Sequence, residues 1–327
     1  MQATAAALRG MSVVVLSLAA TNGIAQEDYP NRPVRIIVPF PPGGSTDPMA
    51  RLVAAKLGER WGGATIVVDN RPGANTVIGT SIVAKAAPDG YTMGYCGASL
   101  FSSATLIPDI PYNAVSDFVG VTAIAKSRVI LVVHPTLPVK SLKEVIAMAK
   151  SKPGHLSFGT SGIGTNTHLS AELFMQLTGT QLLHVPYKGS GPLTNDLLAG
   201  RVNLSFQISI TQIPNIQAGK LRPLAITGDN RIKVLPNVPT FDEAGLANFG
   251  LAGWTCLMAP KGTPMSVREK VANTWAQIAK DPDMQALMEK QGMEIYVASP
   301  DETTRLIRES VAEYGKVIRD AKITFRP

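Results

Sequence analysis

The chain has 327 residues, with 31 Lys and Arg against 24 Asp and Glu and a formal net charge of +7. The basic residues are scattered, with no Lys/Arg run and no interleaved aromatic residues, which argues against nucleic acid as a partner. A mild positive field instead favours anionic solutes, and the length exceeds what one hydrophobic core usually serves, so two lobes are expected.

The N-terminal segment has the layout of a secretory signal peptide. Arg9 supplies a positive charge, an apolar stretch covers 11–20, and small residues surround a cleavage point after Ala25. The stretch is too short for a permanent membrane span. A buried N-terminal helix is the alternative, but the segment lacks a polar face. We therefore expect a signal peptide over 1–25 and a soluble periplasmic protein that starts at Gln26, without a lipid anchor because no cysteine follows the cut.

A pattern of apolar strand, small-residue turn and amphipathic helix then recurs. Val34–Val38 is predicted to be a strand and 39–45 (PFPPGGS) a turn. The segment from Pro48 is predicted to be a helix with Thr46 or Asp47 as its N-cap, because Pro suits the first helical turn. The same reasoning predicts strands over 65–69 and 91–96 with a helix over 77–86 between them.

The pattern restarts after a crossover near 124–134. Strands are predicted over 156–158, 182–185, 202–206 and 221–227, and helices over about 166–177 and up to 199. The chain is expected to cross back near 254–259, and helices are predicted over 266–280 and 300–321.

This order of elements predicts an α/β fold, because parallel strands joined by helices form doubly wound sheets with ligands at the carboxyl ends of the strands. We expect a discontinuous first lobe of residues 26–125 plus 252–327 around a second lobe of residues 126–251. Two crossings between lobes form a hinge, and the cleft between hinged lobes is a common ligand site.

Two Gly-rich turns are the features most typical of a binding site. Each follows a strand and opens a helix, so backbone N–H groups at the positive end of a helix dipole face one cleft, and this arrangement binds anions. Dipoles alone are too weak for micromolar binding, so directed hydrogen bonds to a charged oxygen are needed. The alternative is that the turns only cap helices, a role that also satisfies Asp47. The hydroxyls placed to bind an anion belong to Ser45, Thr46, Ser99, Thr160, Ser161 and Thr165.

Lys188 lies in a third turn, 186–191 (PYKGSG). It either contacts an anion or remains a solvated turn lysine, and the sequence leaves both interpretations open.

Enzymatic and cofactor sites are weakly supported. GTSGI at 159–163 resembles a nucleophile elbow around Ser161, but Ile163 replaces the final glycine. The histidines are predicted to be structural, and His168 and Glu172, four apart on a helix, lack a third metal ligand and are predicted to form a surface pair. GIGTNT at 162–167 lacks the last glycine of the dinucleotide fingerprint, and no Walker-type phosphate loop occurs. No catalytic residue, cofactor or metal is therefore expected.

The two cysteines, Cys96 and Cys256, fit no metal-ligand spacing. Both lie in apolar, strand-like stretches. They either pair in an oxidising compartment or stay as buried thiols.

Long Pro/Gly-rich runs resemble one known family. YPNRPVRIIVPFPPGGSTD at 29–47 is similar to the opening of the tripartite tricarboxylate transporter substrate-binding proteins, the Bordetella uptake gene (Bug) receptors. The resemblance continues in order over the rest of the mature chain, through VVDNRPGA (67–74), APDGYT (87–92), FGTSGIGTNTHLSAELF (158–174), HVPYKGSGP (184–192), AGKLRPLAIT (218–227), LPNVPTFDEAG (235–245) and APKGTP (259–264).

The resemblance implies a two-lobe periplasmic binding protein fold, type II-like, that closes around its ligand without cofactor or chemistry. It also implies a small carboxylate ligand, such as a di- or tricarboxylate or an aromatic acid, and delivery to membrane permease subunits of a tripartite tricarboxylate transporter by a monomeric receptor. A receptor that passes its liganded form to a signalling partner is an alternative, and a secreted hydrolase using Ser161 is another. Carried over by motif, the expected ligand-binding residues are Phe40, Pro41, Gly44, Ser45, Thr46, Asp47, Ser99, Thr160, Ser161, Gly162, Gly164, Thr165 and Gln207.

Two positions depart from the family pattern. Asn75-Thr76 stands where the family usually has a Gly-Gly pair, so side chains there narrow the cleft wall or add a hydrogen bond. Gln207 stands where the family often has Asp, and the loss of that carboxylate argues against a ligand ammonium group. We therefore expect a carboxylate without a positive charge.

Overall fold

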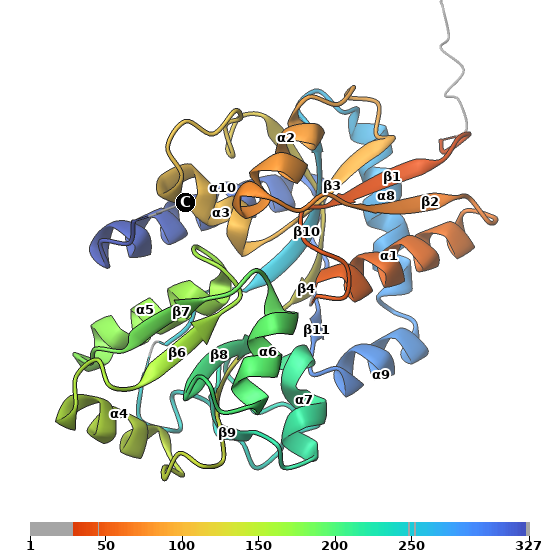
Figure 1. Ribbon diagram of the computed structural model, residues 1–327. Coiled ribbons are helices and arrows are strands. Elements are labelled where there is room, and N and C mark those ends of the chain that lie inside the picture. The colour runs from red at the N-terminus through yellow and green to blue at the C-terminus, as the bar shows by residue number, and fades with distance from the viewer. Residues whose placement is uncertain (1–28, 45, 248, 252, 325–327) are drawn as a thin grey trace, which may run out of the picture.

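The computed structural model describes residues 29–44, 46–247, 249–251 and 253–324 of the chain. The expected signal peptide and Ser45 lie outside the described residues. Two β-sheets, each flanked by helices, lie one above the other in Figure 1.

Each sheet is the centre of one lobe. The first lobe contains the sheet with strand order β11-β4-β10-β3-β1-β2, formed by β1 (Val34–Val38), β2 (Ile66–Asn70), β3 (Thr92–Cys96), β4 (Phe118–Lys126), β10 (Trp254–Pro260) and β11 (Glu294–Ile295). The second lobe contains the sheet with order β7-β6-β8-β5-β9, formed by β5 (Val129–Val133), β6 (Ser157–Thr160), β7 (Leu183–Pro186), β8 (Leu204–Ile208) and β9 (Arg222–Ile226).

Helices cover both faces of each sheet. In the first lobe they are α1 (Thr46–Arg60), the short 3-10 helix η1 (Ala74–Thr76), α2 (Val77–Ala84), α3 (Ala98–Leu106), α8 (Met265–Ile278), α9 (Pro282–Lys290) and α10 (Pro300–Asp320). In the second lobe they are α4 (Leu142–Ser151), α5 (Asn166–Thr178), α6 (Ser190–Leu198) and α7 (Ser209–Gln217). The α/β fold class expected from the sequence is confirmed.

The sheets are mixed, which refines the expectation of parallel strands. In the first lobe β1 pairs in parallel with β2 and β3, whereas β10 runs antiparallel to both β3 and β4. In the second lobe β5 is antiparallel to β8 and β9. The reversed strands are those that carry the chain between lobes: β4 runs toward the second lobe and β10 returns from it, so the two neighbours must point in opposite directions.

The alternation of apolar residues along a strand builds a core on each side of its sheet, because successive side chains point to opposite faces. Along β1, Val34, Ile36 and Val38 join the core formed with α1 and α8, whereas Ile37 joins the core on the face covered by α2, α3 and α10. The second lobe repeats this arrangement, with α4 and α5 on one face and α6 and α7 on the other.

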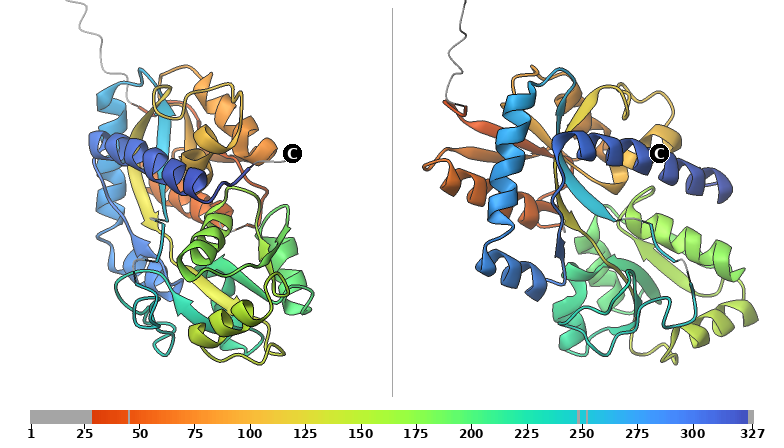
Figure 2. Two further views of the ribbon diagram at one scale, coloured as in Figure 1. Left: turned by 90° about the vertical axis from the view of Figure 1, so that its left-hand side faces the viewer. Right: turned by 180° about the vertical axis from the view of Figure 1, so that it is seen from behind.

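The lobes also touch each other outside the crossings. Leu169 of α5 belongs to the core formed by α3 and α10, and the Ser102 hydroxyl of α3 donates to the carbonyl of Gly164 at 2.8 Å. Behind the molecule, α9 reaches the second lobe, where Glu289 pairs with Lys233 at 2.6 Å (Figure 2).

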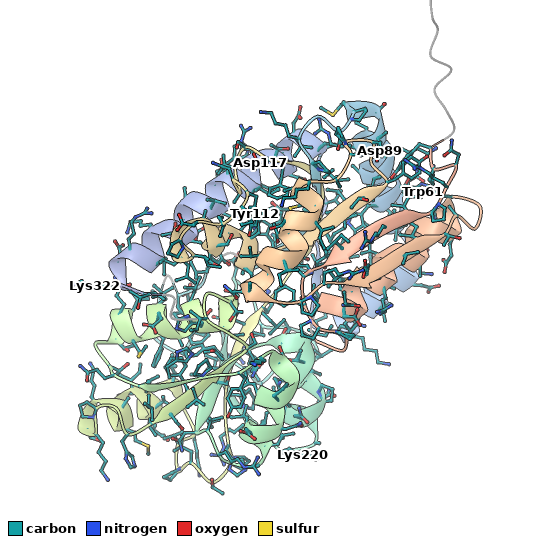
Figure 3. All side chains as sticks on the ribbon, turned by 45° about the horizontal axis from the view of Figure 1, so that its top comes forward. Trp61, Asp89, Tyr112, Asp117, Lys220 and Lys322 are labelled. Atoms are coloured by element: carbon teal, nitrogen blue, oxygen red, sulfur yellow. A yellow bond between two sulfur atoms is a disulfide. The ribbon has the colours of Figure 1, made fainter. Side chains whose placement is uncertain are left out.

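A disulfide settles the question that the sequence left open for the cysteines. Cys96 of β3 and Cys256 of β10 stand opposite each other in the antiparallel ladder and are bonded. The bond joins the last residue of β3 to the start of β10, close to the point where the chain returns from the second lobe. None of the described helices carries an apolar run of the length that a membrane span requires. Figure 3 shows the charged side chain of Lys220 at the periphery of the second lobe, far from the junction of the lobes.

Candidate functional site

A cavity of about 200 Å³ lies between the lobes, where the carboxyl ends of the parallel strands meet. It is smaller than the pockets of roughly 300–1,000 Å³ that hold drug-sized ligands, so its volume suits a small metabolite. Its lining comes from the turns after β1, β3, β6 and β7, from the ends of β8 and β10, and from Ser127 and Gly253 in the crossings.

Helix N-termini converge on this cavity. The first residues of α1, α3, α5, α6 and α7 all contribute to its lining, through Thr46, Ala98, Asn166, Ser190 and Ile210. No side chain caps the start of α3, α5, α6 or α7, so the first N–H groups of these helices are left for other acceptors. Several positive dipole ends aimed at one cavity favour a negatively charged ligand.

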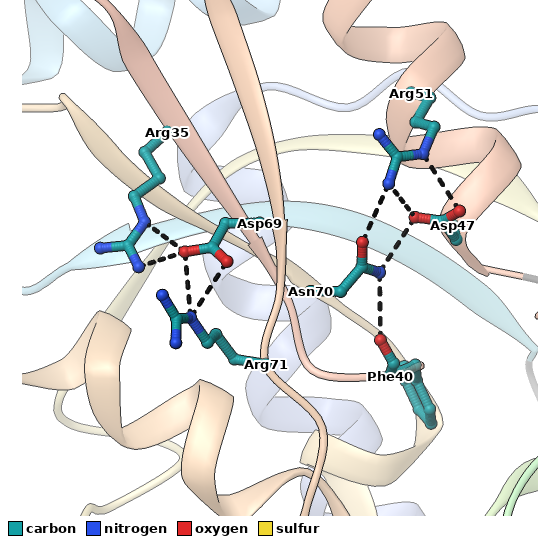
Figure 4. A network of polar contacts seen from close by, with 7 residues as sticks. All are labelled: Arg35, Phe40, Asp47, Arg51, Asp69, Asn70 and Arg71. Atoms are coloured by element: carbon teal, nitrogen blue, oxygen red, sulfur yellow. Dashed lines mark hydrogen bonds and ion pairs between the residues drawn. The ribbon is translucent and has the colours of Figure 1, made fainter. Parts of the chain in front are cut away.

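Asp47 holds the first Gly-rich turn in place and does not line the cavity. Helix α1 begins at Thr46, so Asp47 lies inside its first turn and is not the N-cap that the sequence suggested. Its carboxylate accepts from Asn70 at 2.9 Å and from Arg51 at 3.1 Å (Figure 4). It also accepts from the Gly43 N–H at 3.2 Å. Burial opposes ionisation, but these hydrogen bonds outweigh it and lower the pKa of Asp47. Asp47 therefore organises the turn while staying ionised.

The second Gly-rich turn carries a cluster of three hydroxyls. Ser161, Thr165 and Thr167 lie within 2.9–3.4 Å of one another and all line the cavity. The Ser161 N–H donates to the Thr167 hydroxyl and the Gly164 N–H donates to His168, so these two amides are engaged inside the protein. The Thr165 hydroxyl in turn donates to the Gly162 carbonyl at 2.7 Å. The donors that remain for a ligand are thus the Ser161 and Thr167 hydroxyls and the N–H groups of the first turn of α5, rather than every group of the turn.

Two stacked imidazoles support this turn from beneath. The rings of His168 and His184 are 4.3 Å apart, and His184 contacts the Thr160 hydroxyl at 2.7 Å. Burial, followed by the nearby His168, lowers the pKa of His184 to about 4. His168 is buried and lies 3.3 Å from Glu172, so the prediction of a surface pair was wrong: helix α5 turns this face toward the core.

These contacts leave no base for Ser161. His184 is bonded to Thr160, and His168 is occupied by the Gly164 amide and Glu172. Ser161 bonds only to hydroxyls among the described side chains, so the hydroxyl lacks the histidine that a serine nucleophile requires. The residues that the structure describes also hold no group of three metal-ligating side chains.

Lys188 is the one charged side chain among the described residues of the lining. It lies in the turn after β7 and is exposed. No acidic side chain lines the cavity within the described ranges, because Asp47 is turned into its own network.

The structure brings together some of the residues that the sequence predicted and leaves others outside the lining. Seven line the cavity: Phe40, Pro41, Gly44, Thr46, Ser99, Ser161 and Thr165. Five others are not part of the described lining and support it instead or lie elsewhere: Asp47, Thr160, Gly162, Gly164 and Gln207. Ser45 lies outside the described residues.

The two departures from the family pattern lie away from the lining. Gln207 is fully buried within β8 and donates to Ser205 at 3.1 Å, so the structure does not connect its amide to the cavity. Asn75 has a left-handed backbone, with φ of 49°, and its amide lies against Gly164 across the junction of the lobes. Asn75 therefore shapes the contact between lobes.

Sequence reasoning missed a group of lining residues that share no motif. Asn166 and Thr167 open α5, and the amide oxygen of Asn166 is buried without a hydrogen-bond partner among the described residues. Their place at the start of a predicted helix was the available signal. The apolar part of the lining had no local signal, because its members come from different elements: Met49, Tyr95, Ile208, Ile210, Trp254 and Met293.

Comparison with known proteins identifies the family. The sequence model of one protein family, the tripartite tricarboxylate transporter family receptors, matches residues 49–323. The chain belongs to this receptor family. Protein BugT of Bordetella pertussis is 36% identical over 316 residues, which cover 96% of each chain.

Solved structures of receptors in this family share the fold. The structure of R. palustris Rpa4515 with adipate has a TM-score of 0.86 and 36% identity, covering 91% of this chain and 99% of the other. The structure of MatC from Rhodopseudomonas palustris with bound malate has a TM-score of 0.80 and 29% identity, covering 89% of this chain and 100% of the other.

Membership in a family of transporter receptors identifies this chain as a binding protein and not an enzyme. The family resemblance noted in the sequence is thereby confirmed, together with its non-enzymatic character.

Proposed function

We propose that this receptor captures a small carboxylate without a positive charge in the periplasm and delivers it to the membrane permease of a tripartite tricarboxylate transporter. The observation that carries the proposal is the convergence of uncapped helix N-termini on a cavity without a described acidic side chain. Relatives of the family have been solved with adipate and malate, which are carboxylates. Secretion through residues 1–25, as a monomer without a lipid anchor, is part of the proposal.

In this proposal one carboxylate lies between the two Gly-rich turns. The hydroxyls of Thr46 and Ser99 contact it from the first lobe and that of Ser161 from the second, where Thr165 lines the cavity next to Ser161. Ser45 is proposed as a further contact on the sequence alone. Phe40, Pro41 and Gly44 form the facing wall, whereas Asp47, Thr160, Gly162, Gly164 and Gln207 support the site without contacting the ligand. Hydrogen bonds to a charged oxygen contribute about 1.5–3 kcal/mol each, so three or four account for micromolar affinity.

Closure of the lobes is the second part of the proposal. Residues 26–125 with 252–327 and residues 126–251 would move as two bodies about the crossings at Ser127 and Gly253. The Ser102–Gly164 hydrogen bond forms only when the lobes are together, because its two residues belong to different lobes. A ligand that contacts both lobes stabilises this closed arrangement.

A thermal-shift screen of mono-, di- and tricarboxylates tests the capture of a carboxylate. A ligand that binds only the folded protein, at 100 times its dissociation constant, adds about 2.7 kcal/mol to the free energy of unfolding. We expect at least one acid to raise the melting temperature, and amino acids of the same length to leave it unchanged. A screen in which no carboxylate shifts the melting temperature would refute the proposal.

The substitution Gly164→Ala tests closure. A Cβ on Gly164 would lie 2.2 Å from the Leu106 side chain and 3.2 Å from the Ser102 hydroxyl of the other lobe. Affinity for the acid found in the screen should fall about tenfold, because the strain arises only when the lobes meet. Gly179→Ala is the matched control: its φ of 64° resembles the 74° of Gly164, but nothing lies near its Cβ. Equal losses of affinity in both variants would rule out closure as the cause.

A further inference from the structure

We propose that Asn75 determines how long this receptor holds its ligand, although it is not part of the described cavity lining. Its side-chain amide donates to the carbonyl of Gly164, across the junction of the lobes, once they close on a carboxylate. The inference rests on the proposed function and adds a positioning residue to it, one that acts on the closed arrangement and not on the ligand itself.

The backbone around Asn75 has an unusual conformation. Ala74, Asn75 and Thr76 follow one another with φ of 45°, 49° and 76°, all in the left-handed region. An L-residue carries a steric cost in this region, and asparagine tolerates it better than alanine or threonine does. Such residues persist only where the surrounding structure holds them, and they cluster at ligand-binding and switching segments. The conformation therefore indicates a role for this segment beyond the connection of β2 to α2.

Two buried polar atoms of the segment have no hydrogen-bond partner among the described residues. They are the amide nitrogen of Asn75 and the hydroxyl oxygen of Thr76. A buried donor without an acceptor destabilises a folded protein, so nearly all such groups are paired. The Asn75 amide is thus held, at a cost in stability, in a place where only a further contact would satisfy it.

That contact is within reach at the second lobe. A Cβ built on Gly164 would lie 3.3 Å from the amide nitrogen of Asn75 and 3.2 Å from the Ser102 hydroxyl, so both groups of the first lobe face this residue. The Gly164 N–H already donates to His168, and the Gly164 carbonyl accepts from Ser102 at 2.8 Å. A carbonyl oxygen has two lone pairs, so the second is left for the Asn75 amide.

Closure on a ligand brings the two groups together. Gly164 belongs to the same turn as Ser161 and Thr165, which line the cavity, whereas Asn75 belongs to the first lobe. A carboxylate bound between the lobes draws this turn toward the first lobe, and the Asn75 amide then gains its acceptor. A hydrogen bond that forms only in the liganded protein slows the release of the ligand more than it speeds its capture.

Three single substitutions separate the amide from the backbone strain. Ala74→Gly relieves strain and keeps the amide, whereas Asn75→Gly relieves strain and removes the amide. Asn75→Ala removes the amide and leaves a residue that tolerates the left-handed region less well. The probe is adipate or, if adipate does not bind, the acid that raises the melting temperature most in the screen. Titration calorimetry measures the affinity, and stopped-flow displacement measures the dissociation rate.

Affinity should follow the amide, and the melting temperature should follow the strain. We expect Asn75→Gly and Asn75→Ala to bind the probe about fivefold more weakly, through faster dissociation, because one hydrogen bond between neutral groups is lost. Ala74→Gly should bind the probe as the wild-type protein does. Its melting temperature should rise by about 2 °C, whereas that of Asn75→Ala should fall by about 2 °C.

The inference is overturned if Asn75→Gly binds the probe as tightly as the wild-type protein does. It is also overturned if Ala74→Gly weakens binding as much as Asn75→Gly, since the flexibility of the segment is then the cause, or if the losses appear only in the association rate. Each of these results leaves the proposed function standing, because the wild-type protein still binds the acid. Binding of no carboxylate by the wild-type protein overturns both.

Discussion

The crossings between the lobes separate two hollows that differ in charge. The first is the cavity described above, here called the front cavity, and the second is a cavity of about 620 Å³, here called the rear hollow. Both are lined in part by Ser127, Gly253 and Trp254. The rear hollow is larger, yet no helix begins at its described lining, and acidic residues there outnumber basic ones. These are Asp229, Asp242, Glu294, Glu309 and Glu313 against Lys126 and Arg128.

The charge pattern, rather than the volume, thus favours the front cavity as the carboxylate site that we propose. An acidic hollow repels a carboxylate, and its basic residues already have partners: Lys126 and Arg128 both pair with Glu294, at 3.0 and 3.3 Å. The front cavity offers helix N-termini, hydroxyls and one lysine. A carboxylate should therefore bind at the front, and changes at the two sides should have separable effects.

The largest expected effect is on the free energy of unfolding, and it comes from removing the Cys96–Cys256 disulfide, of which Cys96 lines the front cavity. The Cys96–Cys256 bond closes a loop with a sequence separation of 160 that contains the whole second lobe. In the chain-entropy model, a loop of this length stabilises the folded state by about 5 kcal/mol. Replacing both cysteines by Ala should lower the free energy of unfolding by 3 to about 5 kcal/mol, measured by denaturation in urea. Dithiothreitol should destabilise the wild-type protein under denaturing conditions and leave the variant unchanged.

The histidine pair beneath the second turn predicts a loss of stability in acid. The pKa of His184 is lowered to about 4 by burial and then by His168, whereas an unfolded histidine has a pKa of about 6.5. Between these values the unfolded chain binds a proton that the folded protein excludes, so stability is complete above pH 6.5 and falls as the pH drops toward 4. After allowance for solvent screening, the loss is about 2 kcal/mol.

Thermal unfolding between pH 7 and pH 4 measures this dependence. His184→Gln should have a smaller slope over the same range, because glutamine keeps a hydrogen-bonding group beside Thr160 but does not titrate. A slope that is identical in the variant would assign the pH dependence to other groups.

Within the front cavity, Ser161→Ala should weaken carboxylate binding about tenfold, because one hydrogen bond to a charged oxygen is lost. The fold should be retained, since Thr165 and Thr167 remain bonded to each other at 2.9 Å. Titration calorimetry with the best acid measures the change. Ser151→Ala, on an exposed serine at the end of α4, is the control and should bind as the wild-type protein does.

The smallest effect is expected at the rear hollow. Arg128→Met removes the hydrogen bond to the Thr227 carbonyl and one ion pair, but Glu294 keeps its contact with Lys126. A partly exposed pair contributes little, so stability should fall by about 1 kcal/mol. The affinity for the carboxylate found in the thermal-shift screen should not change. A change in that affinity would show that the rear hollow also acts on the ligand, and would contradict the separation of the two sides.

Local sequence patterns predicted the elements that carry long or regular signals. The strand Val34–Val38 and helices such as 266–280 and 300–321 correspond to β1, α8 and α10 in the structure. Helices α3, α4, α7 and α9 were missed. They have 9 or 10 residues each, which offers few apolar repeats for a period to be recognised. The equally short α2 and α6 were predicted from the Pro/Gly-containing turns that precede them and not from a period.

The sequence by itself determined the Gly-rich turns, because a turn between a strand and a helix depends on nearby residues that are adjacent in the chain. Thr46, Ser99, Ser161 and Thr165 could be named for that reason, and they line the cavity. Only the tertiary structure decided which groups share that cavity with them. Asp47 turns into its own network, Gln207 is buried in β8, and Lys188 comes beside Ser161 through the pairing of β6 with β7. Contacts between residues far apart in sequence depend on how strands are ordered and how lobes meet, and no local pattern encodes that order.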